Sequence, residues 1–314
     1  MKKTLPWLLP LFIFSFLSSC EPEGPGDKDP EPPVAEDIIE IPDEHFKHAL
    51  VNTNSIDTNG DHVGDSNIDL NNDGEIQRSE ANSIRGLVIH FNYNDFNRYV
   101  DLKGIENFVN LEYFKMTGDL LFEEIDHELL SYDLSNLKKL RFLEMNNLGT
   151  NAFKDLDLQG LADLEELKII NSRPDYSKDG EDYGNPLNFM DVNLAGTPNL
   201  TIMDITNSFL NIDFCQVPSL KRLNMFYLEG GEPEIFDFHC LTELEWLNIS
   251  ENRIKSLILK NSSILNTLLV KDIGYYGINY PFVEYICIDD FPEEHEQIAT
   301  LIDEHTVVVT DCSF

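Results

Sequence analysis

The stretch Phe238-His-Cys-Leu-Thr-Glu-Leu-Glu-Trp-Leu-Asn-Ile249 decides the fold, because the spacing of its apolar residues recurs along most of the chain. Counted from Phe238, apolar residues follow at offsets 6, 9 and 11, which are Leu244, Leu247 and Ile249. The same four offsets are apolar in Ile105/Leu111/Phe114/Met116, Leu134/Leu140/Leu143/Met145, Leu158/Leu164/Leu167/Ile169, Leu194/Leu200/Met203/Ile205, Phe214/Leu220/Leu223/Met225 and Leu259/Leu265/Leu268/Val270. Successive second positions lie 29, 24, 36, 20, 24 and 21 residues apart. This period indicates an internal structural repeat with one long insertion.

The Leu-x-x-Leu-x-Leu core of each unit resembles the leucine-rich repeat family. The resemblance implies a repeat solenoid with a curved parallel sheet, a mostly irregular convex side, a helical N-terminal cap and a C-terminal β-α-β cap. Offsets 9 and 11 flank one residue, so a short strand directs both of them into the core and turns the intervening residue to solvent. The usual asparagine, three residues after the last apolar position, occurs only at Asn252, so we expect the buried asparagine ladder to be mostly missing.

Residues 1–19 have the features of a secretory signal, with Lys2 and Lys3 before an apolar run that ends in Leu17-Ser-Ser-Cys20. The run has about 13 residues, fewer than the roughly 20 that span a bilayer. Leu-Ser-Ser-Cys resembles a lipobox, which implies that Cys20 is lipidated. The implied location is the bacterial outer membrane, at the cell surface or on the periplasmic face. The alternative is an ordinary cleaved signal.

The rest of the chain divides into a tether and a capped solenoid. Residues 20–36 are rich in proline and acidic side chains, which suits an extended tether and not a packed core. We expect an N-terminal cap over 37–83, repeats over 84–290 and a C-terminal cap over 291–314. Pro42 and Asp43 can start a capping helix. In the insertion at 170–192, the spacing of the acidic residues matches no known metal-binding loop, so its role is left open.

A stretch inside the N-terminal cap fits the loop of an EF-hand calcium site. It has oxygen side chains at positions 1, 3, 5 and 9, glycine (Gly74) at position 6, and glutamate at position 12. The expected ligands are Asp69, Asn71, Asp73, the Glu75 carbonyl, Gln77 and Glu80. The alternative is a polar turn without a metal.

A second, weaker candidate loop lies twelve residues earlier. Its possible ligands are Asp57, Asn59, Asp61 and Asp65. His62 replaces the glycine and Ile68 stands where the bidentate glutamate should be, so this loop is incomplete. The number of calcium ions, one or two, is therefore left open.

Four cysteines besides Cys20 can pair in three ways, and outside the cytoplasm we expect them to be oxidised. Cys215 and Cys240 occupy similar points in adjacent units, which favours a bond between them; free buried thiols are the alternative. Tyr285-Ile-Cys287-Ile-Asp-Asp and Asp311-Cys312 resemble the C-terminal cap of secreted bacterial leucine-rich repeat proteins. That resemblance implies a Cys287–Cys312 disulfide.

Function is sought on the outward face of the strands, because stacked repeats make one extended surface. The outward residues before each offset 9 form a predicted row, Tyr113, Phe142, Glu166, Ile202, Arg222, Trp246, Thr267 and Tyr285. Of these, Tyr113, Phe142, Arg222, Trp246 and Tyr285 are the candidate ligand surface, since aromatic and arginine side chains anchor proteins and stack on sugars. Packing across strands is the alternative role.

Composition and motifs narrow the function. The net charge of −35 disfavours nucleic acid and attracts divalent cations, so Ca²⁺ is the expected cofactor. The sequence favours a calcium-stabilised binding protein, held at the membrane only by its N-terminal lipid, that recognises a protein or a glycan. A hydrolase using carboxylates and a calcium sensor are the alternatives. Neither His-Glu-x-x-His nor Gly-x-Ser-x-Gly occurs, so we expect no enzyme.

Overall fold

The computed structural model describes residues 37–92, 99–121, 124–125, 127–150, 155–174, 190–228, 234–271, 273 and 283–312. They belong to the compact unit Asp37–Phe314. The predicted signal, Cys20 and tether lie outside the described residues, as does most of the insertion at 170–192. None of the helices in the described ranges has the length and apolar character needed to cross a bilayer.

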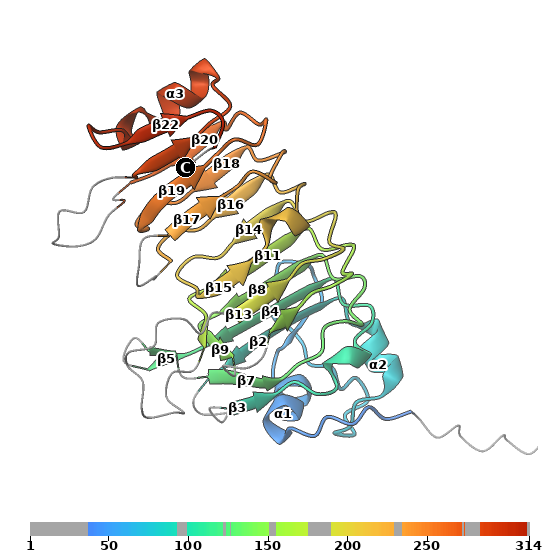
Figure 1. Cartoon of the computed structure of the whole chain (residues 1–314). Coiled ribbons are helices and arrows are strands. Elements are labelled where there is room, and N and C mark those ends of the chain that lie inside the picture. Colours follow the sequence, from blue (N-terminus) through green and yellow to red (C-terminus); the bar gives the residue numbers. More distant parts are fainter. Residues whose placement is uncertain are drawn as a thin grey trace, which may run out of the picture. The chain divides into compact units, whose positions relative to one another are not determined.

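The main element is a nine-stranded sheet, called here the front sheet (Figure 1). Its strands in order are β1 (Ile56–Asp57), β2 (Gly86–Phe91), β4 (Tyr113–Gly118), β8 (Phe142–Asn146), β11 (Glu166–Ile170), β14 (Ile202–Asp204), β16 (Arg222–Asn224), β18 (Trp246–Asn248) and β20 (Thr267–Leu269). β1 pairs antiparallel with β2, and every later neighbour pairs parallel. Parallel pairing follows from the repeat, because each coil re-enters the sheet in the same direction.

The chain between front-sheet strands also forms short parallel ladders, called here the back ladders. They are β12 (Arg173–Pro174), β9 (Leu148–Thr150), β7 (His127–Ser131) and β3 (Tyr99–Asp101); β10 (Leu156–Asp157), β13 (Met190–Asn193) and β15 (Leu210–Ile212); and β17 (Glu234–Asp237), β19 (Ile254–Ile258), β21 (Tyr285–Cys287) and β22 (Val307–Val309). The remaining pair, β5 (Leu120–Leu121) and β6 (Glu124–Ile125), is a small antiparallel hairpin. This part of each coil is thus more regular than the sequence predicts.

The repeat positions form one continuous core, and the predicted solenoid is confirmed. All but three of the repeat positions identified above are buried; Phe214, Leu268 and Val270 are partly buried and pack against the same core. Short 3-10 turns η1 (Ile105–Asn107) and η2 (Phe214–Gln216) connect the coils. Because no unit can bury its apolar row alone, each depends on its neighbours for stability.

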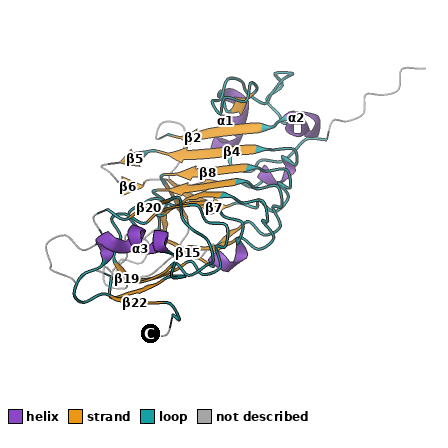
Figure 2. Ribbon diagram, turned by 90° about the horizontal axis from the view of Figure 1, so that it is seen from above, coloured by secondary structure: helices purple, strands orange, loops and turns teal. Residues whose placement is uncertain are grey.

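Helical caps close both ends of the repeats (Figure 2). At the N-terminal end, α1 (Glu44–Asn52) starts where Asp43 Oδ1 accepts the backbone N–H groups of His45 and Phe46 at 2.9 and 3.0 Å. The short α2 (Arg78–Ser83) follows the Asp69 loop. At the other end, α3 (Pro292–Ile298) and η3 (Ala299–Leu301) connect the parallel strands β21 and β22, which is the predicted β-α-β cap.

An asparagine ladder exists at a position that the sequence pattern did not indicate. Asn147, Asn171 and Asn207 each lie two residues after the last apolar position of their unit, with φ of 54°, 51° and 50°. Asn207 Nδ2 donates to Asn171 Oδ1 at 2.7 Å, and Asn171 Nδ2 donates to Asn147 Oδ1 at 2.7 Å. Asparagine tolerates this left-handed conformation better than most residues, so one residue type serves both the turn and the ladder.

Candidate ligand-binding face, calcium loops and disulfides

The outward residues of the front sheet are aligned by strand register into one row, called here the front row. The partners run from Gly86 through Tyr113, Phe142, Glu166, Ile202, Arg222 and Trp246 to Thr267, each directly opposite the next. The pairing reproduces the order expected from the repeat offsets up to Thr267. Side chains opposite one another on a sheet lie close enough to interact, so this row can act as one surface.

Two of the residues predicted for the ligand surface are wrong: Tyr285 lies outside the front sheet, and Tyr113 is buried. Tyr285 lies on β21, which pairs with β19 and β22 in a back ladder, so it is not in the front sheet. Tyr113 is in the row but is only 7% exposed. The ring of His62, from the second candidate calcium loop, stacks on it with centroids 3.8 Å apart. Burial and the nearby Glu144 carboxylate also raise the pKa of the Tyr113 hydroxyl.

The strongest recognition feature in the row is the pair Arg222 and Trp246. The guanidinium carbon of Arg222 lies 3.6 Å from the centre of the Trp246 ring, within cation–π distance. Arg222 is exposed and Trp246 is half-buried, so both keep a surface for a partner. Phe142, also half-buried, has the Arg141 guanidinium 5.1 Å from its ring centre. Stacking limits the freedom of these side chains before any ligand binds.

The adjacent outward row, called here the second row, is held by polar contacts. It contains Val88, Lys115, Glu144, Lys168, Asp204, Asn224, Asn248 and Leu269. Lys115 Nζ lies 3.0 Å from Glu144 Oε1, and Lys168 Nζ lies 2.6 Å from Glu166 Oε1 in the front row. Asn248 Nδ2 donates to Asn224 Oδ1 at 2.8 Å, and Asn224 Nδ2 donates to Asp204 Oδ2 at 3.0 Å.

Glu144 shows the electrostatic effect of this second row. Partial burial acts to raise its pKa, but hydrogen bonds from Asn146 and Lys115 and the charge of Lys168 outweigh burial, and the pKa lies below its usual value of 4.5. The carboxylate is therefore ionised and fixed at neutral pH, and this part of the surface is preorganised.

In the first candidate calcium loop, the carboxylates of Asp69 and Glu80 are buried and accept backbone N–H groups. Asp69 accepts from Asp73 N at 3.1 Å and Gly74 N at 2.9 Å, while Glu80 accepts from Leu70 N at 2.8 Å and Gln77 N at 3.0 Å. Asp69 and Glu80 are each 6% exposed. Gly74 has φ of +81°, a conformation that favours glycine.

The donor set of this loop fits a calcium ion once two side-chain amides have turned. Asp73 Oδ2 accepts from Asn71 Nδ2 at 2.9 Å and Gln77 Nε2 at 2.8 Å, so both amides would have to turn to present oxygen. The Glu75 carboxylate pairs with Lys47 Nζ on α1 at 2.6 Å, which leaves the Glu75 carbonyl as its contribution. The oxygen-only set and the glutamate at position 12 match what calcium prefers.

The second candidate loop has the same backbone pattern although its sequence departs from the motif. In both loops the N–H of position 5 donates to the side chain at position 3, and that of position 7 donates to position 5. His62, at position 6, adopts φ of 64° where the first loop has Gly74. Asp65 accepts from the Thr58 hydroxyl at 2.9 Å, and Ile68 at position 12 is fully buried. The loop therefore has no carboxylate at position 12, and its histidine covers Tyr113.

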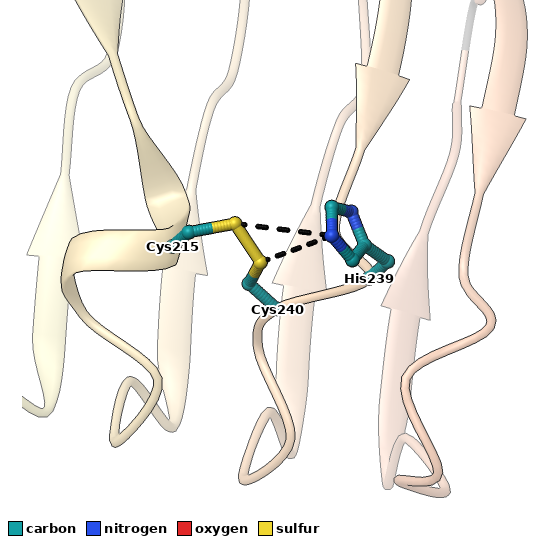
Figure 3. Close-up of side chains that lie close together, drawn as sticks. All are labelled: Cys215, His239 and Cys240. Atoms are coloured by element: carbon teal, nitrogen blue, oxygen red, sulfur yellow. Dashed lines mark hydrogen bonds between the residues drawn. A yellow bond between two sulfur atoms is a disulfide. The ribbon is translucent and has the colours of Figure 1, made fainter.

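The described part of the chain contains two disulfides, Cys215–Cys240 and Cys287–Cys312, which are the two pairs favoured from the sequence. Within the described residues, Cys215, Cys240 and His239 form a group of metal-type side chains within 4.8 Å (Figure 3). The two sulfurs are bonded to each other, and because the thiolate is the metal ligand, this oxidised group is not a metal site.

These features define the class of the protein as a leucine-rich repeat solenoid. No protein-family model matches the chain, and no curated protein matches it. Among solved structures, the chain is similar to an internalin C2 from Listeria monocytogenes, at 17% identity over 88% of this chain and 98% of that chain, with a TM-score of 0.39. It is also similar to an internalin (inlF) from the same organism, at 17% identity over 89% and 98%, with a TM-score of 0.20. Similarities this low carry no functional argument, so the class rests on the repeat and the strand pairing.

Proposed function

We propose that this chain is a cell-envelope binding protein that recognises a protein or a glycan through the outward face of the front sheet. The observation that carries the proposal is the stacked Arg222–Trp246 pair inside a row aligned across consecutive strands. Arginine and tryptophan are enriched among residues that dominate binding energy. The surface that we assign is Phe142, Ile202, Arg222 and Trp246, without Tyr113 and Tyr285.

Preorganisation supports a binding role for this face. Side chains that are already ordered lose less conformational entropy when a ligand binds. The ion pairs and amide chain of the second row hold polar groups beside the aromatic and apolar groups of the front row. The net charge of −35 repels phosphate groups, so the partner class excludes nucleic acid.

Site-specific photo-crosslinking tests this proposal in intact cells. A photoreactive amino acid at Ile202, half-buried in the front row, should give discrete adducts with the partner. The matched control is Ile235 on β17, an apolar residue that is 63% exposed on a back ladder. Adducts from Ile235 and not from Ile202 would place recognition on the back ladders and reject the front face.

A structural calcium ion in the Asp69 loop is the second part of the proposal. The loop connects to α1 through the Lys47–Glu75 pair and leads directly into α2, so an ion there would brace the N-terminal cap. A sensor role is less well supported, because residues 53–77 contain no helix that enters the loop. A hydrolytic role has no catalytic motif in the sequence to support it, since neither His-Glu-x-x-His nor Gly-x-Ser-x-Gly occurs.

Membrane attachment through Cys20 is the third part, and it rests on the lipobox-like sequence alone. The Cys20→Ala substitution should abolish lipidation and release the protein from the membrane fraction. Each acyl CH₂ buried in the bilayer contributes about 0.8 kcal/mol to anchoring, and the variant loses this contribution. Fractionation followed by immunoblotting measures this. If Cys20→Ala stays in the membrane fraction to the same extent as wild type, lipid anchoring at Cys20 is wrong.

A further inference from the structure

The disulfide Cys215–Cys240 has an imidazole directed at both of its sulfurs (Figure 3). His239 Nε2 lies 3.1 Å from Cys240 Sγ and 3.9 Å from Cys215 Sγ. The side chain of His239 is 57% exposed, and Cys215 is exposed as well. A reagent in solution can therefore reach the disulfide and the imidazole together.

Asp237, a positioning residue at the end of β17, sets the orientation of this imidazole. Its Oδ1 lies 2.8 Å from His239 Nδ1 and also accepts the backbone N–H of His239 at 3.0 Å. A proton on Nδ1 is thus held by the carboxylate, and Nε2 is the nitrogen left to exchange a proton with sulfur. The sequence Asp237-Phe-His239-Cys240 places these groups in order on one short segment.

We propose that Cys215–Cys240 is a thiol–disulfide exchange site for low-molecular-weight thiols, with His239 as the acid and base for Cys240. An external thiolate attacks the exposed Cys215 sulfur, which forms a mixed disulfide and breaks the bond to Cys240. The electron pair of that bond stays on Cys240, whose sulfur takes a proton from His239. A second thiolate then attacks the external sulfur of the mixed disulfide and releases Cys215 as a thiolate. The external thiols are oxidised to a disulfide as the protein pair is reduced.

The direction of attack follows from the two distances. The sulfur nearer to the imidazole makes the better leaving group, because its developing negative charge is stabilised and protonated there. In the reverse reaction, the Cys240 thiol would donate its proton to His239, in the manner of a cysteine–histidine nucleophile.

Other charged groups share the cavity that His239 lines. The cavity has a volume of about 460 Å³ and its lining includes Asp237, Lys260 and Asp289. Lys260 Nζ donates to the Thr310 carbonyl, and Asp289 Oδ2 accepts the N–H groups of Asn261 and Ser262 at 3.0 and 2.6 Å. Lys260 and Asp289 thus have their own partners, whereas Asp237 bonds directly to the His239 ring.

The second disulfide provides an internal control within the same molecule. Cys287–Cys312 has the same sequence separation of 25 residues, but Cys287 is fully buried. A chain that merely unfolds under reducing conditions exposes both disulfides. A chain with an exchange site opens Cys215–Cys240 first.

The experiment incubates the full chain with glutathione and follows each disulfide by alkylation and peptide-resolved mass spectrometry. Cys215–Cys240 should open at least about 10-fold faster than Cys287–Cys312, and His239→Gln should slow it by about 10-fold or more. Asp237→Asn should also slow the opening of Cys215–Cys240, because the imidazole loses the carboxylate that orients it, and Asp237→Glu should restore part of the rate. Cys287–Cys312 should be unchanged in both variants.

Three results would overturn the proposal. One is equal opening rates for the two disulfides in the wild type. Another is a His239→Gln variant that opens Cys215–Cys240 as fast as the wild type. The third is a parallel change at Cys287–Cys312 in that variant, because it would show that the substitution acts through general unfolding.

Discussion

Phe238→Ala should lower the free energy of unfolding by about 3–5 kcal/mol, the largest effect that we expect from a single substitution. The ring is fully buried at the start of its repeat unit. It packs against Phe214 of the preceding unit, with ring centroids 5.7 Å apart, and against Phe236 at 6.2 Å. The substitution leaves a cavity between two coils, and neighbouring coils supply most of the stability of each unit.

Phe214→Ala is the matched control for this prediction. It removes the other ring of the same pair, but Phe214 is only partly buried, so the loss should be about 1–2 kcal/mol. Urea unfolding monitored by circular dichroism gives both values. Both phenylalanines occupy the first position of their repeat units and differ in burial, so equal losses in the two variants would show that burial of the ring does not set the cost and would contradict the prediction.

Calcium should raise the melting temperature of the wild type, and Asp73→Asn should lose most of that increment. An ion that binds only the folded state stabilises it by about 2.7 kcal/mol at a concentration 100 times the dissociation constant. Extracellular sites of this kind have dissociation constants on the order of 0.1 to 1 mM, so roughly 10 mM calcium against a chelator is a suitable comparison.

Asp61→Asn is the control, because the two aspartates occupy position 5 of their loops. Asp73 Oδ1 accepts Glu75 N at 2.8 Å, and Asp61 Oδ1 accepts Val63 N at 2.9 Å. Asparagine keeps this hydrogen bond in both loops and removes the charge; in the first loop it also replaces Asp73 Oδ2, which accepts from Asn71 and Gln77. Equal losses in the two variants would indicate two ions, whereas a wild type that does not respond to calcium would leave the Asp69 stretch as a polar turn.

The front row could be predicted from the sequence because the offset-9 residue of every unit, from Phe114 to Leu268, lies in a strand of the parallel front sheet. The residue before it therefore faces outward in each unit. The repeat spacing wrongly placed Tyr285 in the front row. A three-residue strand has the same alternation of buried and outward residues in a back ladder as in the front sheet, so the sequence pattern does not distinguish the two. Pairing of Tyr285 with Ser256 puts it in the back ladder, and that long-range pairing is not encoded in local spacing.

A contact between distant segments accounts for the failure at Tyr113. His62 covers Tyr113 from a loop about fifty residues upstream, and no periodicity relates the two.

The Asn147 ladder was missed because the family pattern directs attention to the residue three positions after the last apolar one, where Ser172, Ser208 and Asn252 are buried instead. Asparagine at the same offset in three units was a signal that could have revealed the ladder.

The role of the front row is tested most directly by the affinity of Trp246→Ala for a ligand identified with the wild type on protein and glycan arrays. We expect an affinity loss of about 2 kcal/mol or more, roughly 30-fold in the dissociation constant, with a nearly unchanged melting temperature. Ile235→Ala, on the back ladder, should bind like the wild type. Unchanged binding by Trp246→Ala together with a lowered melting temperature would show that Trp246 serves packing, and would contradict recognition through this face.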